Sequence, residues 1–300
     1  MLRLIVNADD MGLTERVNEG ILQAHQTGIV TSTSIIANGA AFEDAVIRCK
    51  KVATLDVGVH LTLVEERPCL KPDLIPTLVD SAGRLHHHAT AFVKKYIAGK
   101  IQLEEVWREL EAQVRRVLSH GITVSHLDSH QHLHMLPEIL STTVKLARKY
   151  DIPAIRLPRE PIRTYMFRGA GALPRVLELM VLNGFCFLQQ SRIKLRTDHV
   201  AGFHIAGNLN KKNLQKLLQA LPDDGICELM CHPGLDDRSS RYTHWRYRWQ
   251  DELNALVDPQ IGEYFRQRGI SLVTYRELAD NKAACGNEPS EHATQLSTLN

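Results

Sequence analysis

Short apolar runs alternate with longer amphipathic segments along almost the whole chain, and this alternation limits the possible folds more than any other feature. The apolar runs are LRLIV, IVTSTSII, LDVGVHLTL, ITVSHLD, AIRLP, VAGFHI, ICELMCHPG and ISLVTYREL. Most are followed by a segment of helical periodicity, such as LEEVWRELEAQVRRVLSHG. Continuous apolar strands joined by helices are typical of a parallel sheet covered on both faces. The sequence therefore predicts an α/β fold, either a (β/α) barrel or a doubly wound sheet.

Four glycines lie at boundaries between predicted helices and strands, and this regular placement favours one repeating architecture. Gly28, Gly121, Gly184 and Gly269 stand where a helix would end and the next strand begin. We therefore expect a single domain over residues 1–280. Residues 64–100 break the rhythm with three prolines, which predicts a lid or insertion over one end of the sheet. Residues 281–300 lack apolar periodicity, which predicts a mobile C-terminal tail.

The amino-acid composition and the net charge limit which classes of binding partner are expected. Hydrophobic residues make up 44% and the net charge is +2, so a large core is expected and nucleic acid or an anionic membrane is not an expected partner. The N-terminal apolar run is too short for a signal peptide or a membrane span. We expect no transmembrane segment, a cytoplasmic location and reduced cysteines, because the six cysteines form no CxxC pair. A homodimer is compatible with this sequence.

The segment HLDSHQHLHM, residues 126–135, is the densest cluster of metal-ligating residue types. If it is a strand that runs into a loop, residues two apart start on one face. That density favours a metal site or an acid–base site over a polar turn before Pro137. The residues two apart are His126, Asp128, His130, His132 and His134.

Polar side chains also end several other predicted strands. Each has a simpler explanation: the adjacent aspartates could cap a helix, a histidine could be hydrogen-bonded in the core, and another could merely end a strand. Because parallel strands converge at their carboxyl ends, a shared site explains all of them together. These residues are Asp9, Asp10, His60, Asp128, His130, Arg156, Arg159 and His232.

The residue types suit one chemistry. A carboxylate and two neutral imidazoles hold a divalent cation and leave positions open for water and substrate. A second carboxylate beside the ligand can act as a base. Asp9 and Asp10 fit this division because consecutive side chains diverge. Cys231 beside His232 suggests a thiol nucleophile, but strand neighbours point to opposite faces, so this alternative is minor.

The motifs NADDMG, GVHL, HLDSHQHLHM and MCHPG, in this order and spacing, resemble those of the YdjC-like carbohydrate deacetylases, the group that includes chitooligosaccharide deacetylase. The resemblance runs from about residue 2 to residue 280. It implies a (β/α) barrel, TIM-like and regular or distorted, with one divalent metal ion, Mg²⁺ or Zn²⁺. Asp10, His60 and His130 would be the metal ligands, Asp9 the general base and His232 the general acid.

Other positions match the family less tightly. Arg156 in IRLP stands where related polysaccharide deacetylases orient the catalytic aspartate, and Met11 stands where many relatives have phenylalanine. Asp128, His132 and His134 are expected to contact the substrate or to support the metal ligands. His126 is expected to be structural.

The implied activity is hydrolysis of the N-acetyl group from an amino sugar or its glycoconjugate, with release of acetate. In the resembled family, substrates range from chitobiose-like sugars to glycosylated lipids, including a branch linked to hopanoid biosynthesis. The segment RSSRYTHWRYRWQ, residues 238–250, could stack on sugar faces or only anchor a loop. The segment ALPRVLELMVLNGFCFL, residues 172–188, is predicted to be a core helix, with service to a lipid-bearing substrate as the alternative.

Two other classes of protein remain candidates at this stage. A metal-dependent phosphoesterase on a similar barrel would also use Asp and His at strand ends, but usually with two metals and more bridging carboxylates. A non-catalytic metal-binding protein would close the coordination with protein ligands. The HHH sequence at residues 86–88 is predicted to be a solvated loop.

Overall fold

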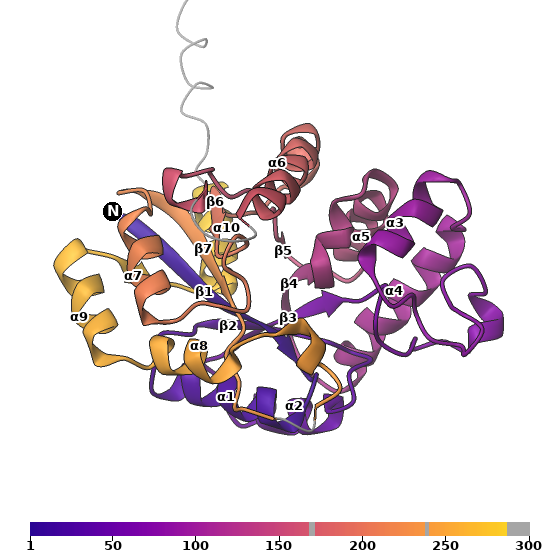
Figure 1. Ribbon diagram of the computed structural model, residues 1–300, viewed down its shortest axis with the longest axis horizontal. Helices are drawn as coiled ribbons and strands as arrows, with labels where there is room; N and C mark the ends of the chain where they lie inside the picture. Colours follow the sequence, from indigo (N-terminus) through magenta and orange to yellow (C-terminus); the bar gives the residue numbers. More distant parts are fainter. Residues whose placement is uncertain (168–171, 238–239, 287–300) are drawn as a thin grey trace, which may run out of the picture.

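A curled, all-parallel sheet forms the centre of the protein (Figure 1). The structure is a computed structural model and describes residues 1–167, 172–237 and 240–286. The strands follow the order β5-β4-β3-β2-β1-β7-β6, and β8 pairs with the start of β1. They are β1 (Leu2–Met11), β2 (Ser32–Ile35), β3 (Asp56–Leu61), β4 (Val124–Ser129), β5 (Ala154–Ile155), β6 (His199–Ala201), β7 (Gly225–Cys231) and β8 (Ser271–Leu272).

Helices pack around the curled sheet and alternate with its strands along the chain, as the sequence predicts. In Figure 1, α3, α4 and α5 lie on one side of the molecule and α7 and α9 on the opposite side. The α-helices are α1 (Glu15–Gln26), α2 (Phe42–Lys50), α3 (Ala89–Ile97), α4 (Leu103–Ser119), α5 (Pro137–Lys149), α6 (Ala172–Gln189), α7 (Lys211–Gln219), α8 (Trp249–Leu256), α9 (Pro259–Arg268) and α10 (Tyr275–Gly286). Short 3₁₀ segments are η1 (Pro72–Leu74), η2 (His130–Met135), η3 (Thr164–Phe167), η4 (Gln190–Arg192) and η5 (Thr243–Trp245).

The two ends of the curled sheet are linked by sparse backbone pairing. The Ile155 N–H donates to the Leu195 carbonyl at 3.3 Å, and the Val200 N–H donates to the Arg159 carbonyl at 2.9 Å. The strands there are short, so the ladder is weakest between β5 and β6. The predicted α/β class and parallel sheet are confirmed, and the curled sheet fits a distorted barrel. A regular TIM-like barrel stays an expectation.

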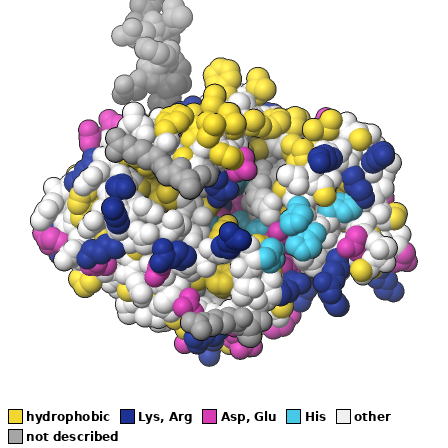
Figure 2. Space-filling view, in the orientation of Figure 1, with side chains coloured by type: hydrophobic (Ala, Val, Ile, Leu, Met, Phe, Trp, Pro, Cys, Tyr) yellow, Lys and Arg dark blue, Asp and Glu magenta, His cyan; other side chains and the backbone are white. Residues whose placement is uncertain are grey.

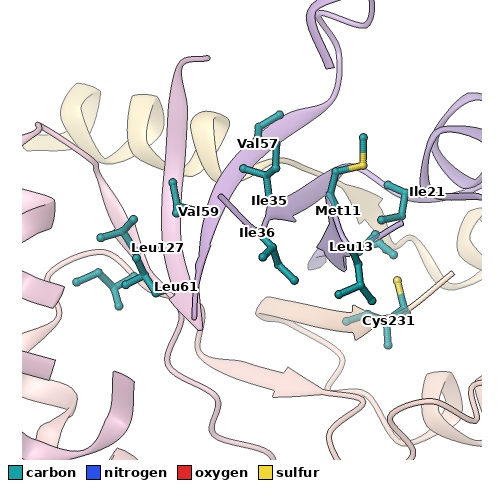
Figure 3. Close-up of a cluster of buried hydrophobic side chains, with 14 of the residues drawn as sticks. Met11, Leu13, Ile21, Ile35, Ile36, Val57, Val59, Leu61, Leu127 and Cys231 are labelled. Atoms are coloured by element: carbon teal, nitrogen blue, oxygen red, sulfur yellow. The ribbon is translucent and has the colours of Figure 1, made fainter. Parts of the chain in front are cut away.

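The core lies where the apolar strands meet the helices. Figure 3 shows Ile35 from β2, Val59 from β3 and Leu127 from β4 within one buried cluster, together with Met11 at the end of β1. All four side chains are fully shielded from solvent. Because β1, β3 and β7 are largely apolar, the polar and charged residues at their carboxyl ends stand out as exceptions to this packing.

Local sequence sets the ends of some helices. Thr14 caps α1 by accepting a hydrogen bond from the Val17 N–H at 3.1 Å. Gly269 ends α9 in the left-handed conformation with φ 63°, as its position in the sequence predicts. The prediction for Gly184 was wrong, because this glycine lies inside α6, which continues to Gln189. A Cβ on Gly184 would meet no atom within 4 Å, so the packing gives no reason to end the helix there.

The insertion predicted at residues 64–100 connects β3 to α4 and contains η1 and α3. It is tied to itself by the bridges between Val64 and His86 and between Val79 and Leu85. The predicted tail begins within α10, which extends to Gly286. The remainder of that tail, residues 287–300, lies outside the described residues.

The prediction of a core helix at residues 172–188 was incomplete. One side of α6 is buried, but the other exposes large apolar side chains to solvent, and Figure 2 shows a ridge of such side chains where Figure 1 places this helix. Ala172–Arg192 is long and apolar enough to cross a membrane by length and composition, and 28% of that window is buried. The exposed side chains are Leu173, Leu177, Met180, Val181, Phe187 and Leu188.

Candidate active site

The backbone at the end of β1 sends the two adjacent aspartates to different partners. The pairing of β1 with β2 shifts register between Ala8 and Met11, and Asp10 has a left-handed backbone with φ 69°. Such a conformation is uncommon for a residue with a side chain, and it turns the strand locally. As a result Asp9 contacts Arg156, whereas Asp10 faces two histidines. The predicted divergence of this pair is confirmed.

Asp10, His60 and His130 converge at the carboxyl ends of β1, β3 and β4. Asp10 Oδ1 lies 3.5 Å from His60 Nε2 and 3.2 Å from His130 Nδ1. One candidate ligand atom from each of the three residues lies within 4.8 Å of the others. Both carboxylate oxygens of Asp10 are buried, and neither has a hydrogen bond of acceptable geometry. A buried carboxylate without hydrogen-bond partners, faced by two imidazoles, fits a divalent cation.

In each of these two imidazoles, the ring nitrogen that does not face Asp10 lies beside another carboxylate. Asp128 Oδ1 lies 2.9 Å from His60 Nδ1, and Glu65 Oε2 lies 3.2 Å from His130 Nε2. The partner nitrogen in each case carries the proton, so the nitrogen that faces Asp10 can offer its lone pair. Orientation of metal-binding histidines by a second group is a common arrangement in metal sites.

The protein's own charges are strongly coupled at this position. Burial opposes ionisation of Asp10, but His130 and His60 outweigh it and lower the pKa of Asp10 to about 2. Burial also disfavours the charged form of His130, yet Asp10 and Glu65 raise its pKa to about 10. The pKa of His60 is raised as well, because the attraction of Asp128 exceeds the cost of burial. Without a cation, the carboxylates therefore favour a second proton on each imidazole, and a bound metal ion would take the place of that proton.

Arg156 is the centre of a second, fully buried network. Its Nη1 and Nη2 donate to the two oxygens of Asp9, each at 2.7 Å. Nη1 also lies 2.6 Å from Asp128 Oδ2, and Nε donates to Glu228 Oε1 at 2.8 Å. Despite burial, the guanidinium and His60 hold the pKa of Asp128 well below its usual range, whereas burial raises the pKa of Glu228. Arg156 thus neutralises charge and fixes the direction of Asp9.

Small polar groups complete this network. Asn7 Nδ2 donates to Asp9 Oδ1 at 2.8 Å and to Ser34 Oγ at 2.9 Å. The Ser34 hydroxyl donates to Asp128 Oδ2 at 2.9 Å and lies 3.0 Å from His126 Nε2. Both oxygens of Asp9 therefore have defined partners, which restricts the carboxylate to one orientation.

His232 follows β7 and lies beside Glu252. Its backbone N–H donates to Glu252 Oε2 at 2.6 Å, and its Nδ1 lies 3.9 Å from the same oxygen. The imidazole packs against the Tyr247 ring at 4.9 Å, and it is close enough to Asp10 to help lower the pKa of that carboxyl. The neighbouring Cys231 is fully buried, which raises the pKa of its thiol well above the usual value. This excludes Cys231 as a thiolate nucleophile.

The histidine-rich segment is a strand only in its first half. His126 and Asp128 share a face of β4 and both contact Ser34. After Ser129 the chain turns into η2, and Gln131 and His132 have left-handed backbones with φ 54°. The two-residue spacing therefore does not continue through the later histidines. The prediction of one shared face was wrong beyond residue 129, because the strand ends there.

The remaining histidines of this segment have supporting contacts. His134 Nδ1 lies 2.6 Å from Ser129 Oγ and Nε2 lies 3.0 Å from the Arg156 carbonyl, so both ring nitrogens are engaged. His132 packs against Phe203 at 5.5 Å, and its Nδ1 is buried without a partner. His126 stacks on Tyr275 at 4.0 Å, as expected of a structural residue. The sequence also places Arg159 at the site, but in the described residues the hydrogen bond that it accepts is with the Val200 N–H of β6, at 2.9 Å, and not with a site residue.

The aromatic segment after β7 is anchored by packing, and part of it lies against the candidate site; stacking on a sugar stays a prediction. Tyr242 and Trp249 are buried and anchor the segment. Trp245 is partly exposed and stacks on His130 with 5.1 Å between ring centroids and 29° between planes. Tyr247 lies against His232. The segment therefore packs over both sides of the candidate site.

Sequence reasoning missed several carboxylates that support the site. Glu228 interrupts the apolar strand ICELMC, and this was a usable signal, since a charge inside a buried strand needs a partner. Glu65 lies in the insertion and Glu252 in a surface helix pattern, so neither could be assigned to the site without knowing the fold. All three are now paired with predicted site residues.

Comparison with known proteins agrees with the sequence motifs. The model of the YdjC-like protein family matches residues 3–267. The chain belongs to the YdjC-like protein family. It is 33% identical over 278 residues to a carbohydrate deacetylase of Geobacillus stearothermophilus, with 91% of this chain and 97% of that protein covered. It is 31% identical over 278 residues to a carbohydrate deacetylase of Brevibacillus brevis, with 92% and 100% covered.

A solved structure of a relative has a similar fold. The crystal structure of an Enterococcus faecalis V583 protein, assigned provisionally to cellobiose-phosphate cleavage, superposes with a TM-score of 0.73. The two sequences are 29% identical, and the match covers 92% of this chain and 98% of the other. The relatives named carbohydrate deacetylase support an enzyme that hydrolyses acetyl groups from sugars.

Proposed function

We propose that this protein is a metal-dependent N-deacetylase that acts on an N-acetylated amino sugar or its glycoconjugate and releases acetate. The observation that carries the proposal is the division of roles between two adjacent aspartates. Asp10 faces two imidazoles with both oxygens free of hydrogen bonds, whereas Asp9 is oriented by Arg156. Relatives named carbohydrate deacetylase support the substrate class.

Asp10, His60 and His130 would hold one divalent ion, and their residue types suit Zn²⁺ or Mg²⁺. When bound, such an ion polarises a carbonyl group and lowers the pKa of water. Its charge would also balance a site in which Asp9, Asp10 and Asp128 outnumber the single buried guanidinium of Arg156.

Asp9 would remove a proton from the water that attacks the acetyl carbon. Arg156 and Asn7 hold its carboxylate in place, so the base need not reorient during the reaction. The proton on the departing nitrogen would come from His232, whose backbone is held by Glu252 and whose ring lies close enough to Asp10 to affect the pKa of that carboxyl. Without that proton the amine is a very poor leaving group. Trp245 and Tyr247 would pack against the sugar ring above His130 and His232.

A phosphoesterase is the second candidate, and the buried ion pairs count against its usual form. Two-metal enzymes need carboxylates that bridge or surround a second ion. A second group of candidate ligands exists in the described part of the chain, formed by Asp9, His60 and Asp128. However, both of its carboxylates are paired with Arg156 at 2.6–2.7 Å. The guanidinium of Arg156 therefore already neutralises the two carboxylates that a second metal ion would need as ligands.

The exposed apolar face of α6 supports a more specific proposal, in which the substrate carries an apolar group. Its exposed face carries Leu173, Leu177 and Met180, each more than half exposed. The buried face packs Val176 and Leu179 into a small cluster with Phe203, and Phe203 contacts His132 beside the site. Apolar surface of this extent is unusual unless it contacts another apolar group. We include glycosylated lipids among the proposed substrates for this reason.

The test is a product analysis on chelator-stripped protein resupplied with Mg²⁺, Zn²⁺, Mn²⁺ or Co²⁺. Substrates are N-acetylglucosamine, its β-1,4-linked oligomers, an alkyl glycoside of the same sugar, and sugar phosphates. Acetate and phosphate are both quantified. Metal-restored acetate release supports the proposal; phosphate release with no acetate from any N-acetyl sugar contradicts it and favours the phosphoesterase.

A separate set of variants tests whether α6 binds an apolar group of the substrate. Leu177→Gln and Met180→Gln should lower kcat/KM for the alkyl glycoside without changing kcat/KM for the free sugar. Ile47→Gln is a matched control, because Ile47 is a 55% exposed apolar residue on α2. Equal kcat/KM for the alkyl glycoside in all three variants and the unmodified protein would rule out a role for α6 in substrate binding.

A further inference from the structure

We propose that Glu65, His87 and His244 form a second divalent-metal site, of the kind that zinc occupies, at the surface beside the catalytic residues. One candidate ligand atom from each residue lies within 4.8 Å of the others. The set shares no residue with Asp10, His60 and His130, and the proposal does not depend on the deacetylase activity. Figure 2 shows histidine side chains gathered beside a hollow on this face of the molecule.

Backbone pairing brings the first two ligands together. Val64 and His86 form a parallel bridge, and the Glu65 N–H donates to the His86 carbonyl at 2.9 Å. The Leu85 N–H donates to the Glu66 carbonyl at 3.1 Å on the same ladder. Residues 64–66 therefore run beside residues 85–87. Backbone pairing keeps Glu65 and His87 close together in any rotamer of their side chains. The HHH sequence is exposed at residues 87–88, but its backbone is fixed.

An ion-pair network brings the third ligand to the same place. Glu66, next to Glu65, accepts a hydrogen bond from the Tyr242 hydroxyl at 2.6 Å and a second from Arg241. Glu66 is buried, so these contacts are shielded from water. They hold η5, which contains His244, against the start of the insertion. Three segments far apart in the sequence are thus fixed at one point before any ion binds.

Hydrogen bonding prepares His244 as a ligand. Its Nδ1 lies 2.9 Å from the Arg241 carbonyl, which can only accept, so Nδ1 carries the proton and Nε2 holds the lone pair. A backbone carbonyl on the other ring nitrogen is a usual partner of metal-binding histidines. The rings of His87 and His244 lie 5.5 Å apart at 69°. Their nitrogens can therefore approach one point from different directions.

The donor set favours zinc. Two imidazoles and one carboxylate, with an exposed fourth position for water, are a common zinc environment. Zinc–nitrogen distances of about 2.0–2.1 Å place tetrahedral ligand atoms roughly 3.4 Å apart, so His87 and His244 must move inward slightly. Both are exposed and can rotate to do so. Glu65 already contacts His130 and Gln131 at 3.2 Å, but a carboxylate has further lone pairs.

An ion at this position would fasten η5 to the insertion directly above the catalytic residues. Trp245 follows His244 and stacks on His130, and Glu65 contacts the same imidazole. Occupancy would therefore restrain Trp245 and reduce local opening of residues 240–248. This effect is measurable without any substrate, as slower cleavage of the segment by a protease.

The test is zinc binding to chelator-stripped protein without a histidine tag, by equilibrium dialysis and elemental analysis at pH 7. His87→Ala/His244→Ala should bind one equivalent fewer than the unmodified protein. His88→Ala should bind as many as the unmodified protein, since His88 is an equally exposed neighbour outside the set. The criterion is a difference between variants, so it does not require that the catalytic residues bind zinc.

A second background isolates the site. Asp10→Asn/His60→Ala removes two of the three catalytic metal ligands and should still bind one zinc, which disappears when His87→Ala and His244→Ala are added. Zinc should also slow proteolysis within residues 240–248 several-fold in this background. The proposal is overturned if the His87→Ala/His244→Ala variant keeps the full zinc content, or if His88→Ala loses the same equivalent.

Discussion

Arg156 donates two hydrogen bonds of 2.7 Å to the carboxylate of Asp9, and both side chains are buried. The pair joins the end of β1 to the residue that follows β5. A planar guanidinium fixes a carboxylate in distance and in angle. The orientation of the proposed base is therefore set by a residue that follows β5, although β4, β3 and β2 lie between β5 and β1 in the sheet.

Arg156→Lys should lower kcat by about 10–100-fold with little change in KM, as supporting residues of active sites typically do. Lysine keeps the charge but cannot form the bidentate pair with Asp9. Steady-state acetate release measures this, and urea unfolding reports the accompanying loss of stability. Arg159→Lys is the control, because Arg159 makes no contact with the site carboxylates. A rise in KM alone would show that Arg156 binds substrate and does not position the base.

His232→Ala should reduce turnover of an N-acetyl sugar by about 10²–10⁴, the usual contribution of general acid catalysis. The same variant should lose far less activity on p-nitrophenyl acetate, because a phenolate leaves without protonation. His232→Gln, closer in size, guards against a folding defect beside Glu252. An equal loss on both substrates would argue that His232 has a role other than proton donation.

Gly58→Ala should destabilise the fold by about 1–3 kcal/mol, the usual cost of overpacking a core. A Cβ at this position would lie 2.4 Å from the His126 ring, which Ser34, Ser125 and Tyr275 hold in place. Urea denaturation measures the change. Gly262→Ala in α9 is the matched control, since a Cβ there meets only Arg266 at 4.0 Å.

The cost of Gly58→Ala should shrink in a His126→Ala background, where the clashing ring is absent. A double-mutant cycle gives that difference directly. If Gly58→Ala costs the same with and without the imidazole, the close approach of β3 to His126 is not the cause.

Glu160 should make stability depend on pH. Burial raises its pKa from 4.5 to about 7, against the hydrogen bonds that it accepts from the Gly202 and His204 N–H groups. Because the folded state holds this proton more tightly than the unfolded state, stability is greatest below about pH 4.5 and falls as pH rises through 7. The loss from this group is about 3 kcal/mol in all.

Urea unfolding of the unmodified protein and Glu160→Gln between pH 5 and 8 measures this contribution. The other titrating groups are common to both proteins, so the difference between the two curves belongs to Glu160. The unmodified protein should lose stability relative to Glu160→Gln as pH rises across this range. Parallel curves would show that the carboxyl titrates near its ordinary value in the fold.

The sequence was sufficient to predict which strand ends meet. Asp10, His60 and His130 follow separate apolar runs, and parallel strands bring their carboxyl ends to one edge whatever the details of packing. That Asp9 and Asp10 diverge also followed from their adjacency in a strand, although the register shift and the left-handed backbone at Asp10 set which partners they meet. These features depend on periodicity and on the direction of the strands, which local sequence determines.

Other features depend on contacts between distant segments. Nothing near Glu65 indicates that it will meet His130, because their approach requires the insertion to fold back over β4. The left-handed turn at Gln131 and His132 is also not encoded by a glycine. Gly184 shows the opposite case, in which a local stop signal is overridden because α6 packs one side and leaves the glycine in open space.

The most direct test of the account compares Asp9→Asn with Asp10→Asn, both in the His87→Ala/His244→Ala background so that only the catalytic metal site remains. Metal binding to stripped protein and metal-restored acetate release are measured on each. Asp9→Asn should bind metal like its parent but turn over about 10²–10⁴ more slowly, whereas Asp10→Asn should lose metal binding. Metal binding lost in Asp9→Asn and kept in Asp10→Asn, or acetate release undiminished in either, would contradict the assignment.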